Sequence, residues 1–129
     1  MRELSAVVFD DDDIFCCLFA RILSKKGIKV TTYANPSQYF CSHPSVQSCP
    51  VEYPCVDFLL TDNKMPEMTG IEFLERLKNM GCKIPDQRIA MISGSLDEEN
   101  QPKVKQLAGN IFDKLDSKSL IIEWIEESK

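Results

Sequence analysis

The sequence predicts an α/β protein in which helices cover both faces of a five-stranded parallel sheet, the arrangement called doubly wound. Two observations lead to this class. Short apolar runs alternate five times with stretches whose apolar residues recur at helical spacing. Strands that alternate with helices in this way lie parallel, because each crossover returns the chain to the same end of the sheet. The length of 129 residues suits one domain, and we expect a single domain over residues 1–129.

The first strand and the first helix have the clearest patterns. Residues 4–9 form an apolar run rich in Val that stops at Asp10, as a strand buried on both faces does. Asp12 or Asp13 is placed to cap the helix that follows, and Gly27 is placed to end it. The apolar positions of this helix are Ile14, Phe15, Leu18, Phe19, Ile22 and Leu23.

The second strand leads into a less regular segment. Residues 28–33 alternate apolar and polar side chains and include β-branched residues, which predicts a strand. Pro36 favours a helix start, and Tyr39 and Phe40 would supply the apolar side of that helix. Residues 41–55 contain three prolines and several serines, and this composition predicts a loop.

The third and fourth strands also end at polar residues. Residues 56–61 predict a strand that leads directly into Asp62 and a polar loop. Residues 88–92 predict the fourth strand, which ends at Ser93. Between these strands, helical spacing is visible in Ile71, Leu74 and Leu77.

The last part of the chain adds two helices and a short strand. Residues 97–108 can form a helix that Pro102 shortens or kinks. Residues 111–112 mark a fifth strand, and Lys114 follows it closely. The final helix is expected to face the core with Leu120, Ile121, Trp124 and Ile125.

Charge and composition exclude several kinds of partner. A net charge of −5 argues against direct nucleic-acid binding, which needs a basic surface, and against an anionic membrane surface. No apolar run has the length of a membrane span, and the first residues lack the pattern of a signal peptide. We therefore expect a cytoplasmic protein whose 6 cysteines are thiols.

Four of the potential metal ligands lie close together in the predicted loop, namely Cys41, His43, Cys49 and Cys55. A zinc site built from them would lack the Cys-x-x-Cys spacing that is typical of structural zinc. We therefore interpret these four residues as incidental to the function.

Acidic and polar residues follow four of the five predicted strands. They are Asp10 and Asp11 after the first strand, Asp62 after the third, Ser93 after the fourth and Lys114 after the fifth. Ligands of open α/β sheets bind beyond the carboxyl ends of the strands, so these five side chains should converge there.

Such a cluster has a consistent chemistry. Three carboxylates at one point repel one another unless a cation joins them, and Mg²⁺ is a hard ion that binds carboxylate oxygens. A carboxylate held there can attack a phosphoryl donor and form an aspartyl phosphate. A lysine ammonium and a serine hydroxyl, here Lys114 and Ser93, can then contact the phosphoryl oxygens.

The same residues lie in recognisable motifs. In chain order these are VVFDDD, LLTDNKMPEMTG, MISG and Lys114. With them the chain resembles the receiver domains of response regulators in two-component systems, of the chemotaxis-regulator type, over nearly its whole length. The resemblance implies the flavodoxin-like strand order 2-1-3-4-5 and a receiver domain without an output domain.

The resemblance also implies a role for each residue of the cluster. Asp62 would be the phosphoacceptor, and Mg²⁺ would be held by Asp10, Asp11, Asp62 and the backbone carbonyl of Lys64. Ser93 and Lys114 would contact the phosphoryl group.

The partners implied by the resemblance are proteins. A histidine kinase or a phosphotransfer protein would donate the phosphoryl group. A downstream protein would bind a face formed by the fourth helix, the fifth strand and the last helix. Such a domain is not a conventional enzyme, because it catalyses only its own phosphorylation and dephosphorylation.

Two positions depart from the usual receiver pattern, and a third lies where that pattern varies. Leu115 replaces the proline that often follows the lysine through a cis bond, so we expect a trans bond here, since a cis bond before Leu costs about 3–4 kcal/mol. Ile111 occupies the position of an aromatic switch residue, whose part Phe112 could take. Lys64 stands at a variable position that tunes the lifetime of the phosphoryl group.

Two alternative functions remain open from the sequence. The segment FDDDDI also resembles the first motif of haloacid-dehalogenase-type phosphatases, with Asp10 as nucleophile and Asp12 as acid and base. That interpretation leaves Asp62 and the loop after it unexplained. A degenerate receiver that is never phosphorylated and acts as a binding module is the second alternative, suggested by Leu115 and Ile111.

Overall fold

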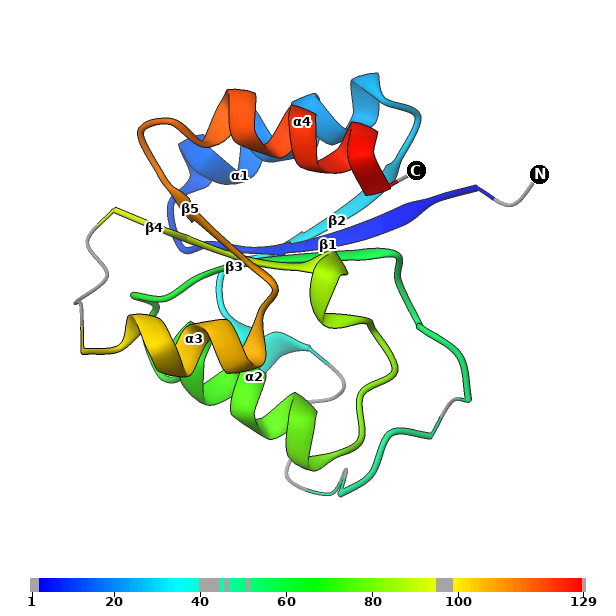
Figure 1. Ribbon diagram of the computed structural model, residues 1–129, viewed down its shortest axis with the longest axis vertical. Coiled ribbons are helices and arrows are strands. Elements are labelled where there is room, and N and C mark those ends of the chain that lie inside the picture. The colour runs from blue at the N-terminus through cyan, green and yellow to red at the C-terminus, as the bar shows by residue number, and fades with distance from the viewer. Residues whose placement is uncertain (1–2, 40–44, 46, 51, 95–98, 129) are drawn as a thin grey trace.

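Five parallel strands form the centre of the protein, as seen in a computed structural model that describes residues 3–39, 45, 47–50, 52–94 and 99–128 (Figure 1). The strand order is β2-β1-β3-β4-β5, which confirms the predicted fold class and strand order. The strands are β1 (Ser5–Phe9), β2 (Lys29–Tyr33), β3 (Phe58–Asp62), β4 (Ile89–Ser93) and β5 (Asn110–Asp113).

Helices cover both faces of this sheet. The helices α1 (Asp13–Lys25) and α4 (Ser117–Ser128) lie on one face, and α2 (Gly70–Asn79) and α3 (Gln101–Leu107) lie on the other (Figure 1). Each face has its own apolar core. The chain is therefore doubly wound, as its alternating pattern predicts.

Apolar side chains from alternate strand positions build these two cores. Toward α1 and α4, Phe58 packs edge-on against Trp124, with their ring centroids 5.3 Å apart. Toward α2 and α3, Phe9 meets Phe73 at 4.7 Å between ring centroids. Strands β3 and β4 are buried along their whole length, so the residues that end them are held in fixed positions.

Strand β2 is one edge of the sheet and is much more exposed. It pairs with β1 in parallel register from Ser5 opposite Lys29 to Phe9 opposite Tyr33, and no strand borders its other side in the described chain. Three of its five residues are exposed.

The helix predicted after β2 is wrong in the residues that the structure describes. Pro36 instead begins a single 3₁₀ turn, η1 (Pro36–Gln38), in which the Asn35 side chain accepts a hydrogen bond from the Ser37 backbone at 2.8 Å. Tyr39 is already extended and packs its ring on Phe9 at 5.2 Å between centroids. Phe40 lies outside the described residues.

Two apolar residues that we expected in the core face solvent. Ile14 is 77% exposed because the capped first turn of α1 carries it beyond the sheet. Leu120 is 36% exposed, since it lies at the edge of the buried stripe of α4 that contains Ile121, Trp124 and Ile125.

Pro102 does not kink a helix. It lies in the first turn of α3, where proline has no hydrogen-bonding donor to lose and its fixed φ suits the helix. The predicted start of this helix near residue 97 falls outside the described residues.

Candidate functional site

The carboxyl ends of the central strands bring the predicted site residues together. Asp10 directly follows β1, and Asp62 is the last residue of β3. Ser93 is the last residue of β4, and its register partner in β5 is Asp113, immediately before Lys114. The convergence that the sequence predicts is therefore present.

Two of the three carboxylates are buried. Asp10 and Asp62 are 1% and 6% exposed, whereas Asp11 faces solvent. One oxygen from each of the three residues can be chosen so that all three atoms lie within 4.8 Å of one another. Among the described residues, no other cluster of three acidic, histidine or cysteine side chains lies this close together.

This donor set fits a hard divalent cation. Oxygen ligands of mixed burial, open to solvent at Asp11, suit an ion such as Mg²⁺ that keeps part of its water shell. The buried Oδ2 atom of Asp10 also has no hydrogen-bond partner among the described residues, although it faces the Lys114 ammonium. This oxygen has an ion pair with Lys114 but no hydrogen bond, so it can also bind a cation.

Lys114 bridges the two buried carboxylates. Its Nζ atom lies 3.0 Å from Asp10 Oδ2 and 3.3 Å from Asp62 Oδ2. The same ammonium lies over the ring of Phe15 in α1, 4.4 Å from the ring centroid, which is a cation–π contact. Lys114 is therefore positioned by contacts with three separate elements.

The loop that carries Lys114 keeps its position without a proline. The Lys114 backbone N–H donates to Ser93 O at 3.1 Å, and the Leu115 N–H donates to Asp113 Oδ1 at 2.9 Å. The described residues contain no cis peptide bond, so the Lys114–Leu115 bond is trans, as expected. Leu115 itself is 90% exposed.

Burial changes the acid–base properties of the cluster. Desolvation raises the pKa of Asp10 above its ordinary value and outweighs the hydrogen bonds that lower it. Desolvation also raises the pKa of Asp62, and the neighbouring Asp10 raises it further. Burial alone would lower the pKa of Lys114, but the two carboxylates raise it overall. Negative charge is therefore in excess at this point of the structure.

The turn after Asp62 anchors that residue to α2. The Asn63 backbone N–H donates to Asp62 Oδ1 at 2.8 Å, and Asn63 O accepts from the Gly70 N–H at 3.0 Å. Asn63 Oδ1 accepts from the Ile71 N–H at 3.2 Å. A Cβ atom on Gly70 would lie 2.3 Å from Asp62 O, so only glycine permits this close approach.

Asp12, rather than Asp13, caps α1. Its side chain accepts from the Ile14 N–H at 2.9 Å, and its own N–H donates to Asp10 Oδ1 at 2.9 Å. The Cys16 thiol donates to Asp10 O at 3.0 Å from the next turn. Burial, with added repulsion from Asp10 and Asp13, raises the pKa of Cys16 to about 11.

The remaining predicted residues take less central positions. Ser93 is buried at the end of β4, and Lys64 is exposed in the loop after β3. Ile111 packs toward the α2 and α3 core, whereas Phe112 packs on Trp124 with ring centroids 5.8 Å apart. Phe112 thus belongs to the opposite face of the sheet from Ile111.

Sequence reasoning missed the supporting roles of Phe15, Asn63 and Gly70. The motif contained a signal for two of them, because Asn at a strand end and Gly at a helix start are typical of tight turns. The place of Phe15 beneath Lys114 had no such signal, since these residues are distant in the sequence. Of the four residues weighed as a zinc set, Cys41 and His43 lie outside the described residues.

Comparison with known protein families gives one clear match. The response regulator receiver domain family matches residues 6–120 of this chain. A curated relative from Treponema denticola, a protein-glutamate methylesterase/protein-glutamine glutaminase, is 30% identical over 86 residues. That match covers 66% of this chain and 21% of the relative, so the chain spans about a fifth of the relative's length.

Solved structures share the fold across the whole chain. FixJ-N is 24% identical with a TM-score of 0.74, and the match covers 99% of this chain and 94% of that one. A Francisella response regulator receiver domain is 18% identical with a TM-score of 0.76, over 97% and 95% of the two chains. A CheY-like receiver domain protein from Methanospirillum hungatei is 22% identical with a TM-score of 0.74, over 98% and 93%. None of the described helices has the length and apolar character needed to cross a membrane.

Proposed function

This chain belongs to the response regulator receiver domain family, and we propose that it accepts its phosphoryl group on Asp62. A phosphoacceptor role in two-component signal transduction follows from the family and from the acidic cluster. The position of Asp62 carries the proposal. This carboxylate is buried at the end of β3, and Lys114 Nζ lies 3.3 Å from its Oδ2.

The proposed reaction is a direct transfer to a carboxylate oxygen. An Asp62 oxygen attacks the phosphorus atom of the donor, and the bond from phosphorus to the donor atom breaks as the new P–O bond forms. When the donor is a phosphohistidine, the departing imidazole takes up a proton. Lys114 stays within reach of the transferred group, and the Ser93 hydroxyl can donate to one of its oxygens.

Asp10, Asp11, Asp62 and the Lys64 carbonyl are proposed to hold Mg²⁺. When bound, the ion supplies positive charge that offsets the carboxylates and the phosphoryl oxygens. The Asp10 oxygen without a hydrogen bond and the proximity of the three carboxylates support this assignment. The self-catalysed formation and loss of the aspartyl phosphate belong to the same proposal.

Protein contacts are proposed to carry the signal in and out. A histidine kinase or a phosphotransfer protein is the class of donor that a receiver domain implies. The downstream partner is proposed to be a protein rather than nucleic acid or membrane, which accords with a net charge of −5. The protein is also proposed to be cytoplasmic. Exposed thiols such as Cys17 and Cys55 stay reduced in a reducing compartment, which supports this location.

We propose that phosphorylation alters the face formed by α3, β5 and α4. Phe112 is held against Trp124, so a displacement of β5 would reach α4 through this ring contact. Comparison of backbone amide NMR spectra of the free and phosphorylated protein checks this. Identical resonances for β5 and α4 in the two states would contradict it.

The phosphoacceptor assignment can be tested with acetyl phosphate and Mg²⁺. Intact-mass spectrometry should show one phosphoryl adduct on the wild type, and none on Asp62→Asn or after chelation of Mg²⁺. Asp116→Asn is the matched control, because Asp116 is an exposed carboxylate in the loop after Lys114. This control should form the adduct as the wild type does.

Other outcomes would point to different chemistry. An adduct that persists in Asp62→Asn but is lost in Asp10→Asn would favour a nucleophilic role for Asp10. The family match argues against this outcome. No adduct from acetyl phosphate or from a phosphorylated histidine phosphotransfer protein would instead indicate a degenerate receiver.

A further inference from the structure

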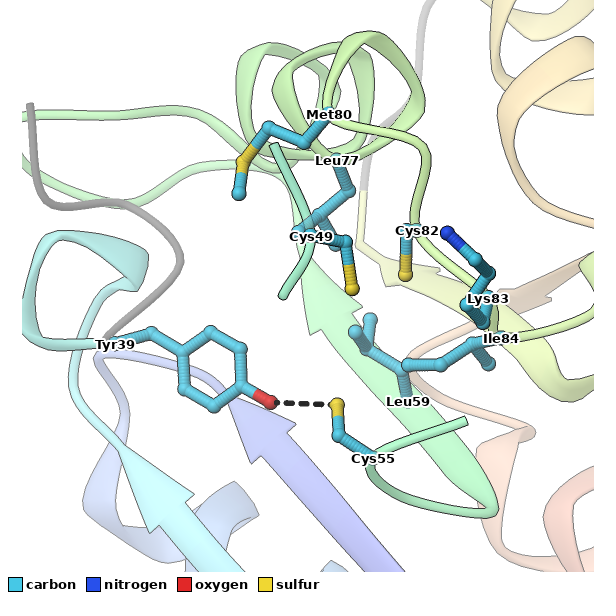
Figure 2. A pocket seen from close by; sticks show the side chains of 9 residues that line it. All are labelled: Tyr39, Cys49, Cys55, Leu59, Leu77, Met80, Cys82, Lys83 and Ile84. Atoms are coloured by element: carbon cyan, nitrogen blue, oxygen red, sulfur yellow. Dashed lines mark hydrogen bonds between the residues drawn. The ribbon is translucent and has the colours of Figure 1, made fainter. Parts of the chain in front are cut away.

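Three cysteines that take no part in the proposed phosphoryl transfer face one apolar pocket. Figure 2 shows Cys49 and Cys55, from the long segment between β2 and β3, and Cys82, from the turn after α2. The pocket lies near the carboxyl-terminal end of α2, whereas Asp62 is anchored at the amino-terminal end. The other residues that line it are Tyr39, Leu59, Leu77, Met80, Lys83 and Ile84.

Backbone hydrogen bonds hold Cys49 and Cys82 beside the same helix end. The Cys49 N–H donates to Met80 O at 2.8 Å, and the Cys82 N–H donates to Leu77 O at 2.9 Å. Gly81, with a φ of 77°, makes the turn that returns Cys82 toward the pocket. Disulfides form only between residues whose backbones are close, with Cα atoms within about 7 Å. The hydrogen bond to Met80 O brings the backbone of Cys49 close to the turn that carries Cys82.

The sulfur atoms of this pair also share an environment. Both residues are half-buried, and their side chains point into the pocket (Figure 2). Burial is the main cause that raises the pKa of the Cys82 thiol, and repulsion from Cys55 and Cys49, which line the same pocket, adds to it. The Cys55 sulfur differs because it is exposed and lies 3.5 Å from Tyr39 Oη, across the pocket.

We propose that Cys49 and Cys82 form a reversible disulfide when the protein meets a peroxide. The Cys49 thiolate attacks one peroxide oxygen, the O–O bond breaks, and a sulfenic acid and one water molecule result after protonation. The Cys82 sulfur then attacks the Cys49 sulfur, the S–O bond breaks, and the Cys82 proton leaves with the hydroxide as a second water. Hydrogen peroxide is reduced and two thiols are oxidised, and a dithiol reductant reverses the reaction.

Such a bond would add a covalent link between two parts of the fold that the hydrogen bond from Cys49 to Met80 O already joins. It would close residues 49–82 into a covalent loop that contains β3, the turn after Asp62 and the whole of α2. The segment after β2 would then be fixed to the end of α2. The reaction needs neither Mg²⁺ nor Asp62. The proposed disulfide can therefore be tested independently of the phosphoacceptor assignment.

Peptide mapping without reductant tests the proposal. The reduced full-length chain is treated with hydrogen peroxide, digested and analysed by mass spectrometry. We expect one linked peptide pair that contains Cys49 and Cys82, with the loss of two hydrogen atoms, and its disappearance in dithiothreitol. Cys55→Ser should keep the link, whereas Cys49→Ser and Cys82→Ser should lose it. The Asp62→Asn variant should form the link at the wild-type rate.

Differential alkylation of the wild type provides a check that does not depend on the folding of variants. After peroxide treatment, Cys49 and Cys82 should lose reactivity together, and the thermal unfolding midpoint should rise until reductant is added. A link between Cys55 and Cys82, or oxidation of Cys49 to sulfinic acid without any link, would overturn the proposal.

Discussion

At the scale of single residues, the site is dominated by an imbalance of charge. Asp10 and Asp62 are both buried, and they share the one ammonium of Lys114. Desolvation by burial raises the pKa of both carboxylates, the neighbouring Asp10 raises that of Asp62 further, and the single ammonium does not reverse these shifts. The free energy that this imbalance costs is the reason why the site should respond to cations, to pH and to substitution.

Replacement of Asp62 by asparagine should stabilise the protein in the absence of Mg²⁺. The variant removes a carboxylate whose ionised form is disfavoured by burial and by Asp10. We expect the free energy of unfolding to rise at neutral pH, because the folded state no longer holds a buried charge beside Asp10. Urea unfolding in a chelating buffer measures this, and Asp116→Asn, at an exposed carboxylate, should leave stability unchanged.

The pH dependence of this difference has a definite sign. Because the folded pKa of Asp62 lies above its ordinary value of 3.8, protonation of Asp62 stabilises the fold. This stabilisation is fully present below pH 3.8. That stability is lost as the pH rises through the folded pKa. The advantage of Asp62→Asn should therefore grow as the pH rises above 3.8 and then level off. An advantage that shrinks over this range would contradict the proposed cause.

Neighbouring cysteines in α1 should differ sharply in reactivity. Cys16 donates its thiol proton to Asp10 O and has a pKa of about 11, whereas Cys17 is exposed. At pH 8 a thiol with that pKa is ionised in about one molecule in a thousand, and only the thiolate is alkylated. Iodoacetamide should therefore modify Cys17 well before Cys16 in the folded protein, as followed by peptide mass mapping. Equal rates should return in concentrated urea.

At the scale of elements, the contact between Gly70 and the end of β3 is the tightest in the site. A Cβ atom on Gly70 would meet Asp62 O at 2.3 Å and the Asn63 Cα at 3.1 Å, and both are backbone atoms that cannot rotate away. Gly70→Ala should cost about 2 kcal/mol of unfolding free energy and impair phosphorylation. Gly94→Ala is the matched control, because its Cβ would meet nothing within 4 Å. Equal urea midpoints for the two variants would argue against this packing.

Most elements follow from periodicity, but the segment after β2 shows where periodicity fails. Five strands and the helices α1, α2 and α4 lie close to the predicted positions, because burial on one or both faces enforces their patterns. Pro36 and Tyr39 alone did not justify a helix. The Asn35 side chain accepts from the Ser37 N–H and the Gln38 side chain accepts from the Ala34 N–H, so side chains satisfy backbone groups of a tight turn. Tyr39 then packs its ring on Phe9.

The residues of the site could be predicted from the sequence, but the residues that hold them in place could not. Asp10, Asp62, Ser93 and Lys114 end or follow strands, and parallel strands place such residues together whatever the surrounding loops do. The ring of Phe15 beneath Lys114 depends on how α1 lies on the sheet, which no local pattern encodes. The exposure of Ile14 also depends on how α1 lies on the sheet. Helical spacing identifies the apolar face of α1, but not where that face extends beyond the sheet.

At the scale of the whole molecule, Mg²⁺ binding should be coupled to folding. The unfolded chain does not bring Asp10, Asp11 and Asp62 together, so an ion that binds all three stabilises the folded state. At ten times the dissociation constant the gain is about 1.4 kcal/mol. A rise of the thermal midpoint with Mg²⁺ in the wild type, and a much smaller rise in Asp10→Asn, is the expected result. An equal response in both would place the ion elsewhere.

The exposed edge strand has a consequence for solubility. Strand β2 presents one row of backbone donors and acceptors that no strand of the described chain covers, and such rows can recruit a second molecule edge to edge. Lys29 begins this strand and Thr31 and Thr32 are exposed within it, so a charge and two hydroxyls make the strand less attractive to a copy of itself. Apolar substitutions here would leave the fold intact and yet make concentrated solutions of the protein prone to aggregate.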